Sequence, residues 1–330
     1  MQYRLNTNSS LVYFFLLLFI FFSCSDEKDN LPIPVYKMDF NRGTPMFNAE
    51  KAYAEIEKQI EFAPRNPNSE GHKKALVYLK TKLEEYSDEV IIQNFEYTGY
   101  EGIRLSLSNI IGKFNPQAEN RIMLCAHWDT RPWADADPDP AKRSSPISGA
   151  NDGASGVAII LEVARILSAN KLNYGIDIVF FDGEDYGKEG DLLNFCLGSK
   201  YYSVAAENNP HFAILLDLVG DKNALFPKES YSIKFAPEIV ELVWETAKKV
   251  NASKFLNATG SPIYDDHIPL NSGGIKTINI IDNDYVGQKA INRKFWHTHE
   301  DTIDKIGLET LQQVGNVIVK LLYSISFTGN

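Results

Sequence analysis

The stretch from Arg121 to Asp129, RIMLCAHWD, decides the fold. Residues 121–126 form a short, mainly apolar run, which is typical of a strand buried within a sheet. His127 and Asp129 follow this run directly, so the predicted strand ends in two polar side chains. In open α/β sheets, ligands bind outside the carboxyl ends of the strands. The stretch therefore predicts a buried strand that ends at a ligand-binding site.

Strands and helices are expected to alternate through the last two thirds of the chain, and this pattern predicts a parallel sheet covered by helices on both faces. We expect an α/β fold of three layers, with a mostly parallel mixed central sheet. Two β-rich segments precede the stretch and are expected to form an antiparallel edge. The expected strands are 89–95, 105–111, 121–126, 176–181, 212–218 and 277–281, and the expected helices are 46–62, 69–87, 153–169, 198–206, 236–250 and 307–326.

The N-terminal residues have a pattern typical of an export signal. Arg4 is the only charge before the apolar run 11–22, which is too short to span a bilayer comfortably. Cys24 follows, and then an acidic stretch at 25–30, an arrangement that resembles the lipoproteins of Bacteroidetes-type bacteria. We therefore expect a lipoprotein signal peptide at 1–24 and a lipid-anchored protein of the cell envelope, periplasmic or on the outer membrane surface. A plain cleaved signal with an incidental cysteine is the alternative.

The remainder divides into a polar, Pro-rich tether at 25–45 and a single catalytic domain at 46–330. Of 330 residues 44% are hydrophobic, and the net charge of −10 comes without a cluster of Lys and Arg, so a nucleic-acid partner is not expected. Cys125 lies in an apolar strand pattern and is expected to be a buried free thiol. Two cysteines after Cys24 make no disulfide framework, and we expect a monomer.

Acidic residues and histidines gather after the predicted strands. Each short motif alone is weak, because an Asn-Asp-Gly is usually a turn and an acidic pair is usually solvated. Together they offer the carboxylates and imidazoles that zinc takes, and a catalytic zinc needs three protein ligands and an open position. The pieces are His127-Trp128-Asp129, Gly149-Ala150-Asn151-Asp152-Gly153, Asp182-Gly183-Glu184-Asp185, Asp217, Asp265-Asp266-His267 and Trp296-His297-Thr298.

From residues 62–65 to the C-terminus, the chain resembles the zinc-dependent exopeptidase superfamily, which contains co-catalytic zinc aminopeptidases and animal-type glutaminyl-peptide cyclotransferases. The motifs at 151–156 (NDGASG) and 180–185 (FFDGED) carry the resemblance. It implies zinc bound by Asp152, Asp185 and His297, with Glu184 as general acid/base. Relatives often have Glu at the second acidic ligand, where this chain has the shorter Asp185. The tryptophan that animal cyclases carry shortly after the acidic pair is replaced by the stretch 186–189.

The cyclase branch is favoured by one position. Aminopeptidases tend to have Ser-Asp-His where this chain has Asp265-Asp266-His267 followed by Ile-Pro, as cyclases do. We expect Asp217 and Asp265 to share protons with Glu184, since adjacent carboxylates cannot all ionise. Asp217 is then less available to a second metal, and one zinc is expected. An aminopeptidase would bind two, with His127 and Asp217 completing the second site and Asp129 lying there or just behind it.

The expected activity is conversion of an N-terminal Gln of peptides or proteins to pyroglutamate with release of ammonia. Zinc would act as a Lewis acid, Glu184 would move the proton, and Asp217 and Asp265 would hold the carboxamide nitrogen. Substrate contacts are expected from Trp296, Tyr264 and His267. A co-catalytic zinc aminopeptidase is the first alternative, and a catalytically inactive surface-binding lipoprotein is the second.

Overall fold

The strand β4 (Arg121–His127) is buried along its whole length and lies inside a six-stranded sheet. The structure of the protein is a computed structural model, which describes residues 36–205, 210–286 and 295–328. The strand order is β2-β3-β5-β4-β6-β9. β4 pairs in parallel with β5 on one side and with β6 on the other, and β6 pairs in parallel with β9. The other strands are β2 (Glu89–Thr98), β3 (Arg104–Phe114), β5 (Gly175–Phe181), β6 (Phe212–Asp217) and β9 (Thr277–Ile281).

The predicted antiparallel edge is present. β2 pairs antiparallel with β3, and β3 pairs antiparallel with β5, so the sheet is mixed as expected. A mostly parallel mixed sheet of this kind agrees with the predicted α/β fold class. Two small sheets join β1 (Tyr36–Met38) to β10 (Ile325–Phe327) and β7 (Phe226–Lys228) to β8 (Phe255–Thr259).

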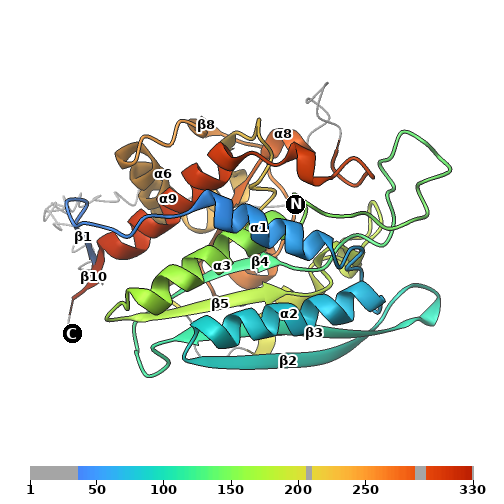
Figure 1. Ribbon diagram of the computed structural model, residues 1–330, viewed down its shortest axis with the longest axis horizontal. Coiled ribbons are helices and arrows are strands. Elements are labelled where there is room, and N and C mark those ends of the chain that lie inside the picture. Colours follow the sequence, from blue (N-terminus) through green and yellow to red (C-terminus); the bar gives the residue numbers. More distant parts are fainter. Residues whose placement is uncertain (1–35, 206–209, 287–294, 329–330) are drawn as a thin grey trace, which may run out of the picture. The chain divides into compact units, whose positions relative to one another are not determined.

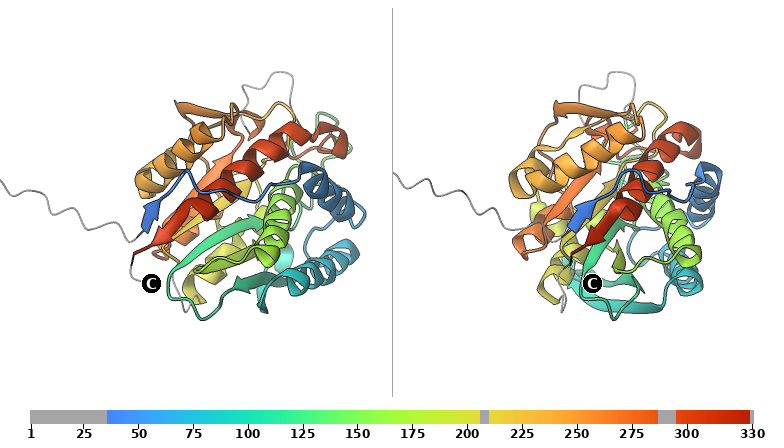
Figure 2. Two further views of the ribbon diagram at one scale, coloured as in Figure 1. Left: turned by 60° about the vertical axis from the view of Figure 1, so that its left-hand side comes forward. Right: turned by 90° about the vertical axis from the view of Figure 1, so that its left-hand side faces the viewer.

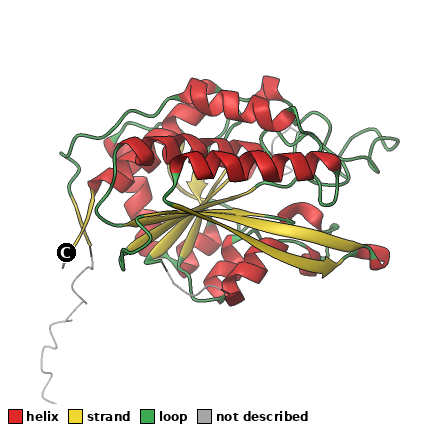
Figure 3. Cartoon of the chain, turned by 60° about the horizontal axis from the view of Figure 1, so that its bottom comes forward, coloured by secondary structure: helices red, strands yellow, loops and turns green. Residues whose placement is uncertain are grey.

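Helices cover both faces of the sheet, which Figure 3 shows nearly edge-on. Alternate side chains of a strand point to opposite faces of the sheet. Leu124 packs in the largest apolar cluster, on one face, and Cys125 packs in a second, smaller cluster on the other face. The larger cluster holds side chains from α1 (Ala49–Ile60), α2 (Glu70–Tyr86), α3 (Ala154–Ala169), α6 (Pro237–Lys249) and α9 (Leu308–Ser324). The smaller one holds side chains from α4 (Leu197–Ala205) and α7 (His267–Ser272). The shorter helices are α5 (Ser230–Phe235) and α8 (Asn283–Val286).

The helix α3 approaches β6 unusually closely, and Figure 1 shows it running beside the central strands β4 and β5. A Cβ atom added at Gly156 would lie 2.1 Å from the carbonyl oxygen of Leu216. Only glycine permits this approach, because any side chain at 156 would push the helix away from the strand. The start of α3 is therefore held against the carboxyl end of β6, which brings Asp152 near Asp217.

The structured domain begins earlier than the sequence pattern suggests. β1 pairs antiparallel with β10, and the backbone N–H of Asp39 donates to the carbonyl of Ser324, so residues 36–45 belong to the domain and not to the tether. Figure 2 shows the blue strand beside the red one. A strand of three residues is too short for its alternation to stand out in a sequence. The predicted signal, Cys24 and residues 25–35 lie outside the described residues.

The predicted helices and strands are present with small shifts at their ends. Ser69 caps α2, because its hydroxyl accepts from the backbone N–H of His72. Cys125 and Cys196 are both buried and free. None of the helices within the described ranges has the length and apolar character needed to cross a membrane.

Candidate active site

The predicted polar residues meet at the carboxyl ends of three parallel strands. His127 is the last residue of β4, Asp217 is the last residue of β6, and the short turn η2 (Glu184–Tyr186) follows β5. Parallel strands end at the same edge of a sheet, so residues far apart in the sequence become neighbours here. Asp129 accepts from the backbone N–H groups of Glu184 (3.1 Å) and Asp185 (3.3 Å), which fixes this turn beside β4.

Asp152 is positioned by the loop that precedes α3. The carboxylate of Asp301 accepts from the backbone N–H groups of Asn151 at 2.9 Å and Asp152 at 3.0 Å, and the Tyr285 hydroxyl donates to it at 3.0 Å. The side chain of Asn151 accepts from the backbone N–H of Gly220 just after β6. Hydrogen bonds thus connect this loop to Gly220, just after β6, and to Asp301, in the segment that also carries His297.

One group of possible metal ligands is the predicted one. Ligand atoms of Asp152, Asp185 and His297 lie within 4.8 Å of one another, and all three residues are buried. The Nε2 atom of His297 lies 3.2 Å from Oδ1 of Asp185 and 3.7 Å from Oδ2 of Asp152. Two carboxylates and an imidazole are a set that zinc accepts in catalytic sites.

A second group shares Asp152 with the first. His127, Asp152 and Asp217 also bring ligand atoms within 4.8 Å of one another. The Nε2 atom of His127 lies 3.1 Å from Oδ1 of Asp152 and 3.3 Å from Oδ1 of Asp217. A carboxylate common to both groups could bridge two metal ions, so the geometry provides for one ion or for two.

The free polar atoms in these groups fit a metal ion. Oδ2 of Asp152, Oδ2 of Asp185 and Oδ1 of Asp217 are buried and make no hydrogen bond with the described residues. Leaving such atoms unsatisfied costs free energy, and a cation among them would remove that cost. Burial and the neighbouring carboxylate of Asp185 raise the pKa of Asp152 to about 7, which shows how strongly the site disfavours its own negative charge.

Glu184 lies next to the two groups and is partly exposed. Its carboxylate, the thiol of Cys196 and the carboxylate of Asp265 lie within 4.8 Å of one another. Burial and the charge of Asp265 raise the pKa of Glu184 well above its usual value. Burial and the charge of Asp217 raise the pKa of Asp265 to about 6. Glu184 is therefore a carboxyl group that can carry a proton beside the candidate metal ligands, as general acid–base catalysis requires.

Comparison with known proteins assigns the chain to a family. Residues 109–322 match the sequence profile described as Peptidase family M28. The chain belongs to this family. The zinc-dependent exopeptidase fold predicted from the sequence is thereby confirmed.

Several relatives of this M28 chain are known. A Bacteroides thetaiotaomicron glutaminyl cyclase bound to N-acetylhistamine is 41% identical, with a TM-score of 0.82 over 85% of this chain and 99% of the other. A structure described as a leucine aminopeptidase precursor from the same species is also 41% identical, with a TM-score of 0.81 over 85% of this chain and 98% of the other. The glutaminyl-peptide cyclotransferase of Gloydius blomhoffii is 23% identical over 77% of this chain and 75% of its own length.

The predicted substrate residues of this M28 chain have different surroundings. Trp296 is partly exposed and stacks on the ring of His297, with centroids 3.5 Å apart. Tyr264 is partly exposed and precedes Asp265. The ring of His267 is fully buried, 3.3 Å from Oε2 of Glu229. Contact of these three residues with substrate stays a prediction, and the ring of His267 faces Glu229 inside the protein.

Sequence reasoning missed the residues that support the ligands. Arg65 is fully buried and donates to the carbonyl oxygens of Trp128, Ser148 and Gly149, which ties the loop after β4 to the loop before Asp152. Arg131 donates to Asp185 and to Asp135, and Asp301 accepts from the backbone N–H groups of Asn151 and Asp152. A single acid or arginine in a polar loop gives no local signal, because its partners lie far away in the sequence.

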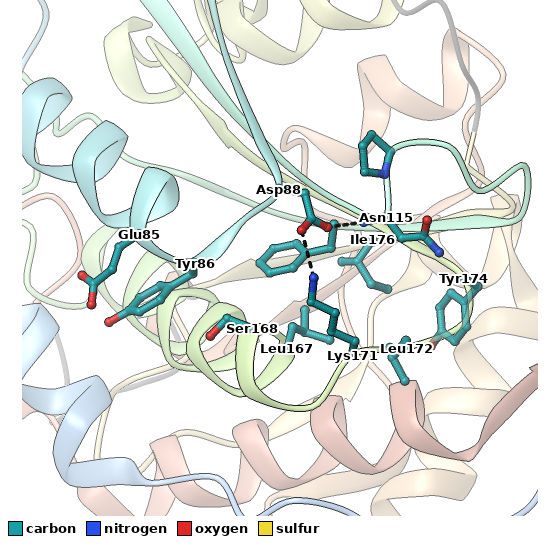
Figure 4. Close-up of a pocket in the computed structure, with 12 residues that line it drawn as sticks. Glu85, Tyr86, Asp88, Asn115, Leu167, Ser168, Lys171, Leu172, Tyr174 and Ile176 are labelled. Atoms are coloured by element: carbon teal, nitrogen blue, oxygen red, sulfur yellow. Dashed lines mark hydrogen bonds and ion pairs between the residues drawn. The ribbon is translucent and has the colours of Figure 1, made fainter.

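A cavity of about 460 Å³ lies near Ile176, at the opposite end of β5 from Glu184 and Asp185. Figure 4 shows the ion pair between Asp88 and Lys171 at its wall, above apolar side chains such as Leu167. Its lining includes no member of the candidate metal groups. The candidate metal ligands therefore lie at the other end of the strands from this cavity.

Proposed function

We propose that this M28 enzyme is a glutaminyl-peptide cyclotransferase, which converts an N-terminal Gln of peptides or proteins to pyroglutamate and releases ammonia. The observation that carries the proposal is the close approach of the carboxylates of Glu184 and Asp265 beside the ligand group Asp152, Asp185 and His297. The similarity to bacterial glutaminyl cyclases at about two fifths identity over nearly their whole length supports it.

The chain's own residues can perform the proton transfers of this reaction. Glu184 takes a proton from the substrate's α-amine, whose nitrogen then bonds to the carboxamide carbon of the same Gln side chain. The bond from that carbon to the carboxamide nitrogen breaks, and Glu184 returns the proton to the departing ammonia. Asp152, Asp185 and His297 would hold a zinc ion, which would supply Lewis-acid chemistry at the carboxamide oxygen. The reaction is intramolecular, so holding the substrate folded back on itself gives much of the acceleration.

Asp265 is held rigidly for its part in this scheme. Its Oδ1 accepts from the backbone N–H of Asp266 at 2.5 Å, and its Oδ2 accepts from the side chain of Asn279 at 2.6 Å. These donors hold the Asp265 carboxylate beside Glu184, so that it orients the Glu184 side chain. Together with Asp217, it accepts hydrogen bonds from the carboxamide nitrogen of the substrate. Trp296 supplies an aromatic surface for the glutamine stem, next to the ligand His297.

A co-catalytic zinc aminopeptidase is the second candidate. The group His127, Asp152 and Asp217 favours it, because it completes a second metal site that shares Asp152 with the first. The similarity to a leucine aminopeptidase precursor points the same way. An aminopeptidase would use an activated water to break a peptide bond, whereas the cyclase needs none.

We expect Gln-initiated peptides to lose about 17 Da without cleavage when incubated with the purified chain, because ammonia leaves as the ring closes. A matched Leu-initiated peptide of the same sequence should stay intact. Mass spectrometry of both peptides measures the result. Release of free Leu at a rate above that of Gln cyclisation would replace the cyclase assignment with the aminopeptidase.

We expect one tightly bound zinc per chain, because Asp217 is engaged with Asp265 in the cyclase scheme. Elemental analysis should show that His297→Ala loses this zinc, whereas His127→Ala, outside the proposed ligand group, retains it. Two stoichiometric metals, with activity that needs both, would support the aminopeptidase instead.

Asp265→Asn should lower turnover of Gln-initiated peptides by about 10²- to 10⁴-fold, the range typical of general acid–base effects. The change keeps the size of the side chain but removes the charge that governs protonation of Glu184. Zinc content and the unfolding transition, measured in parallel, should stay nearly unchanged, because Asp265 is not a proposed ligand. Full cyclisation by the variant would contradict the mechanism.

We also propose that the enzyme is anchored in the cell envelope through a lipid on Cys24. The apolar run 11–22 and the acidic stretch after the cysteine support this placement. Cys24→Ser should leave the protein unprocessed or release it from the membrane fraction, as immunoblots of fractionated cells would show. A variant that is processed and fractionates like the wild type would favour a plain cleaved signal.

A further inference from the structure

The buried residue Arg131 contacts one of the proposed zinc ligands directly. It lies in the loop between β4 and α3, and 1% of its surface is exposed. Its Nη1 atom donates to Oδ1 of Asp185 at 2.8 Å and to the backbone carbonyl of Asp185 at 3.2 Å. Side chain and backbone of the ligand are therefore held by the same guanidinium.

The other side of the guanidinium binds Asp135. Nε donates to Oδ1 of Asp135 at 2.8 Å and Nη2 donates to Oδ2 at 2.5 Å, a bidentate pair. Oδ1 of Asp135 in turn lies 3.5 Å from Nδ1 of His297, whose Nε2 faces Asp185. A carboxylate behind a ligating histidine typically fixes the ring orientation. Arg131 is thus connected to two of the three proposed ligands.

The surroundings of Arg131 leave it little freedom. The guanidinium lies 5.9 Å from the ring centroid of Trp133 and 5.4 Å from that of Phe195. The loop is tied down as well, because the backbone N–H of Ala136 donates to the carbonyl of His297 and that of Ile147 donates to the carbonyl of Arg131. The guanidinium is therefore confined by two aromatic rings and by a loop that is itself hydrogen-bonded in place.

We propose that Arg131 is a positioning residue that holds Asp185 and, through Asp135, His297 in the geometry that binds zinc. The inference rests on the zinc site of the proposed function. The main chain at position 185 is held as well. The backbone of Asp185 is held by Asp129 at its N–H and by Arg131 at its carbonyl, so the carboxylate is presented from a fixed main chain.

Arginine is suited to this bridge and lysine is not. The planar guanidinium offers several N–H donors in a fixed fork, so it can bind Asp185 on one side and Asp135 on the other. A lysine ammonium keeps the charge but is a single point on a flexible stem, which cannot span both carboxylates in this arrangement.

The test measures zinc affinity by competition with a coloured chelator, without any peptide substrate. Arg131→Met should weaken zinc binding by about 10- to 100-fold, the range seen when partners behind metal ligands are removed. Methionine has a similar length and fits between the aromatic rings, so the packing is retained. Arg131→Lys should also weaken binding, by less than Met does.

The matched control is Arg121→Met. Arg121 is buried and forms a bidentate pair with Asp177 at 2.8 and 2.7 Å, but it lies at the start of β4, at the opposite end of the strand from His127. This variant should lower the unfolding temperature and leave zinc affinity within about twofold of wild type. The contrast separates loss of a buried ion pair from loss of ligand positioning.

Zinc affinity of Arg131→Met within twofold of wild type would overturn the proposal. Wild-type affinity of Arg131→Lys would also overturn it, because charge alone would then be sufficient. If Arg131→Met does not fold, Asp135→Asn serves instead, and it should weaken zinc binding in a folded protein. Since these measurements use metal only, they give an answer even if the chain proves not to cyclise Gln.

Discussion

Crowding of carboxylates at one edge of the sheet is the constraint on which the rest of this structure depends. Asp152 is buried within reach of both Asp185 and Asp217, and Glu184 and Asp265 lie within reach of each other beside them. Like charges this close repel strongly where water is excluded. The protein counters the repulsion with guanidinium groups, with backbone N–H donors and with raised pKa values that let carboxyls keep protons. The remaining unsatisfied oxygens are what make a metal ion favourable there.

The fold supplies the rigidity that this crowding needs. A parallel strand pair brings His127 and Asp217 to one edge, and the glycine contact between α3 and β6 brings Asp152 to the same place. The ligands themselves lie in loops, but each loop is fixed from outside, by Asp129, Arg65, Asp301 or Arg131. Rigid strands and cross-linked loops together allow like charges to stay where chemistry requires them.

The sequence predicted the sheet, most of the helices and the candidate metal-ligand groups, because each of them is marked by a pattern of neighbouring residues. An apolar strand followed by His127, or a short motif around Asp152, is visible within ten residues. The supporting residues were missed because their partners are distant: Arg131 acts on Asp185, and Asp301 acts on Asn151 and Asp152. Nothing in a single sequence distinguishes such an arginine from a solvated one. The pairing of β1 with β10 joins nearly the first and last described residues, and strands of three residues give no pattern.

The place of β1 has a practical meaning for handling the enzyme. The ring of Tyr36 lies 5.9 Å from that of Phe212, the first residue of β6, whereas Asp217 ends the same strand at the catalytic edge. Six residues of extended chain separate the two by roughly 17–20 Å. Because β10 pairs with β1, Tyr36 and Phe327 both lie at the end of the sheet away from Asp217. A surface that contacts the β1–β10 pair therefore meets the domain on the side away from Asp217 and leaves the edge with the candidate ligands exposed to solutes.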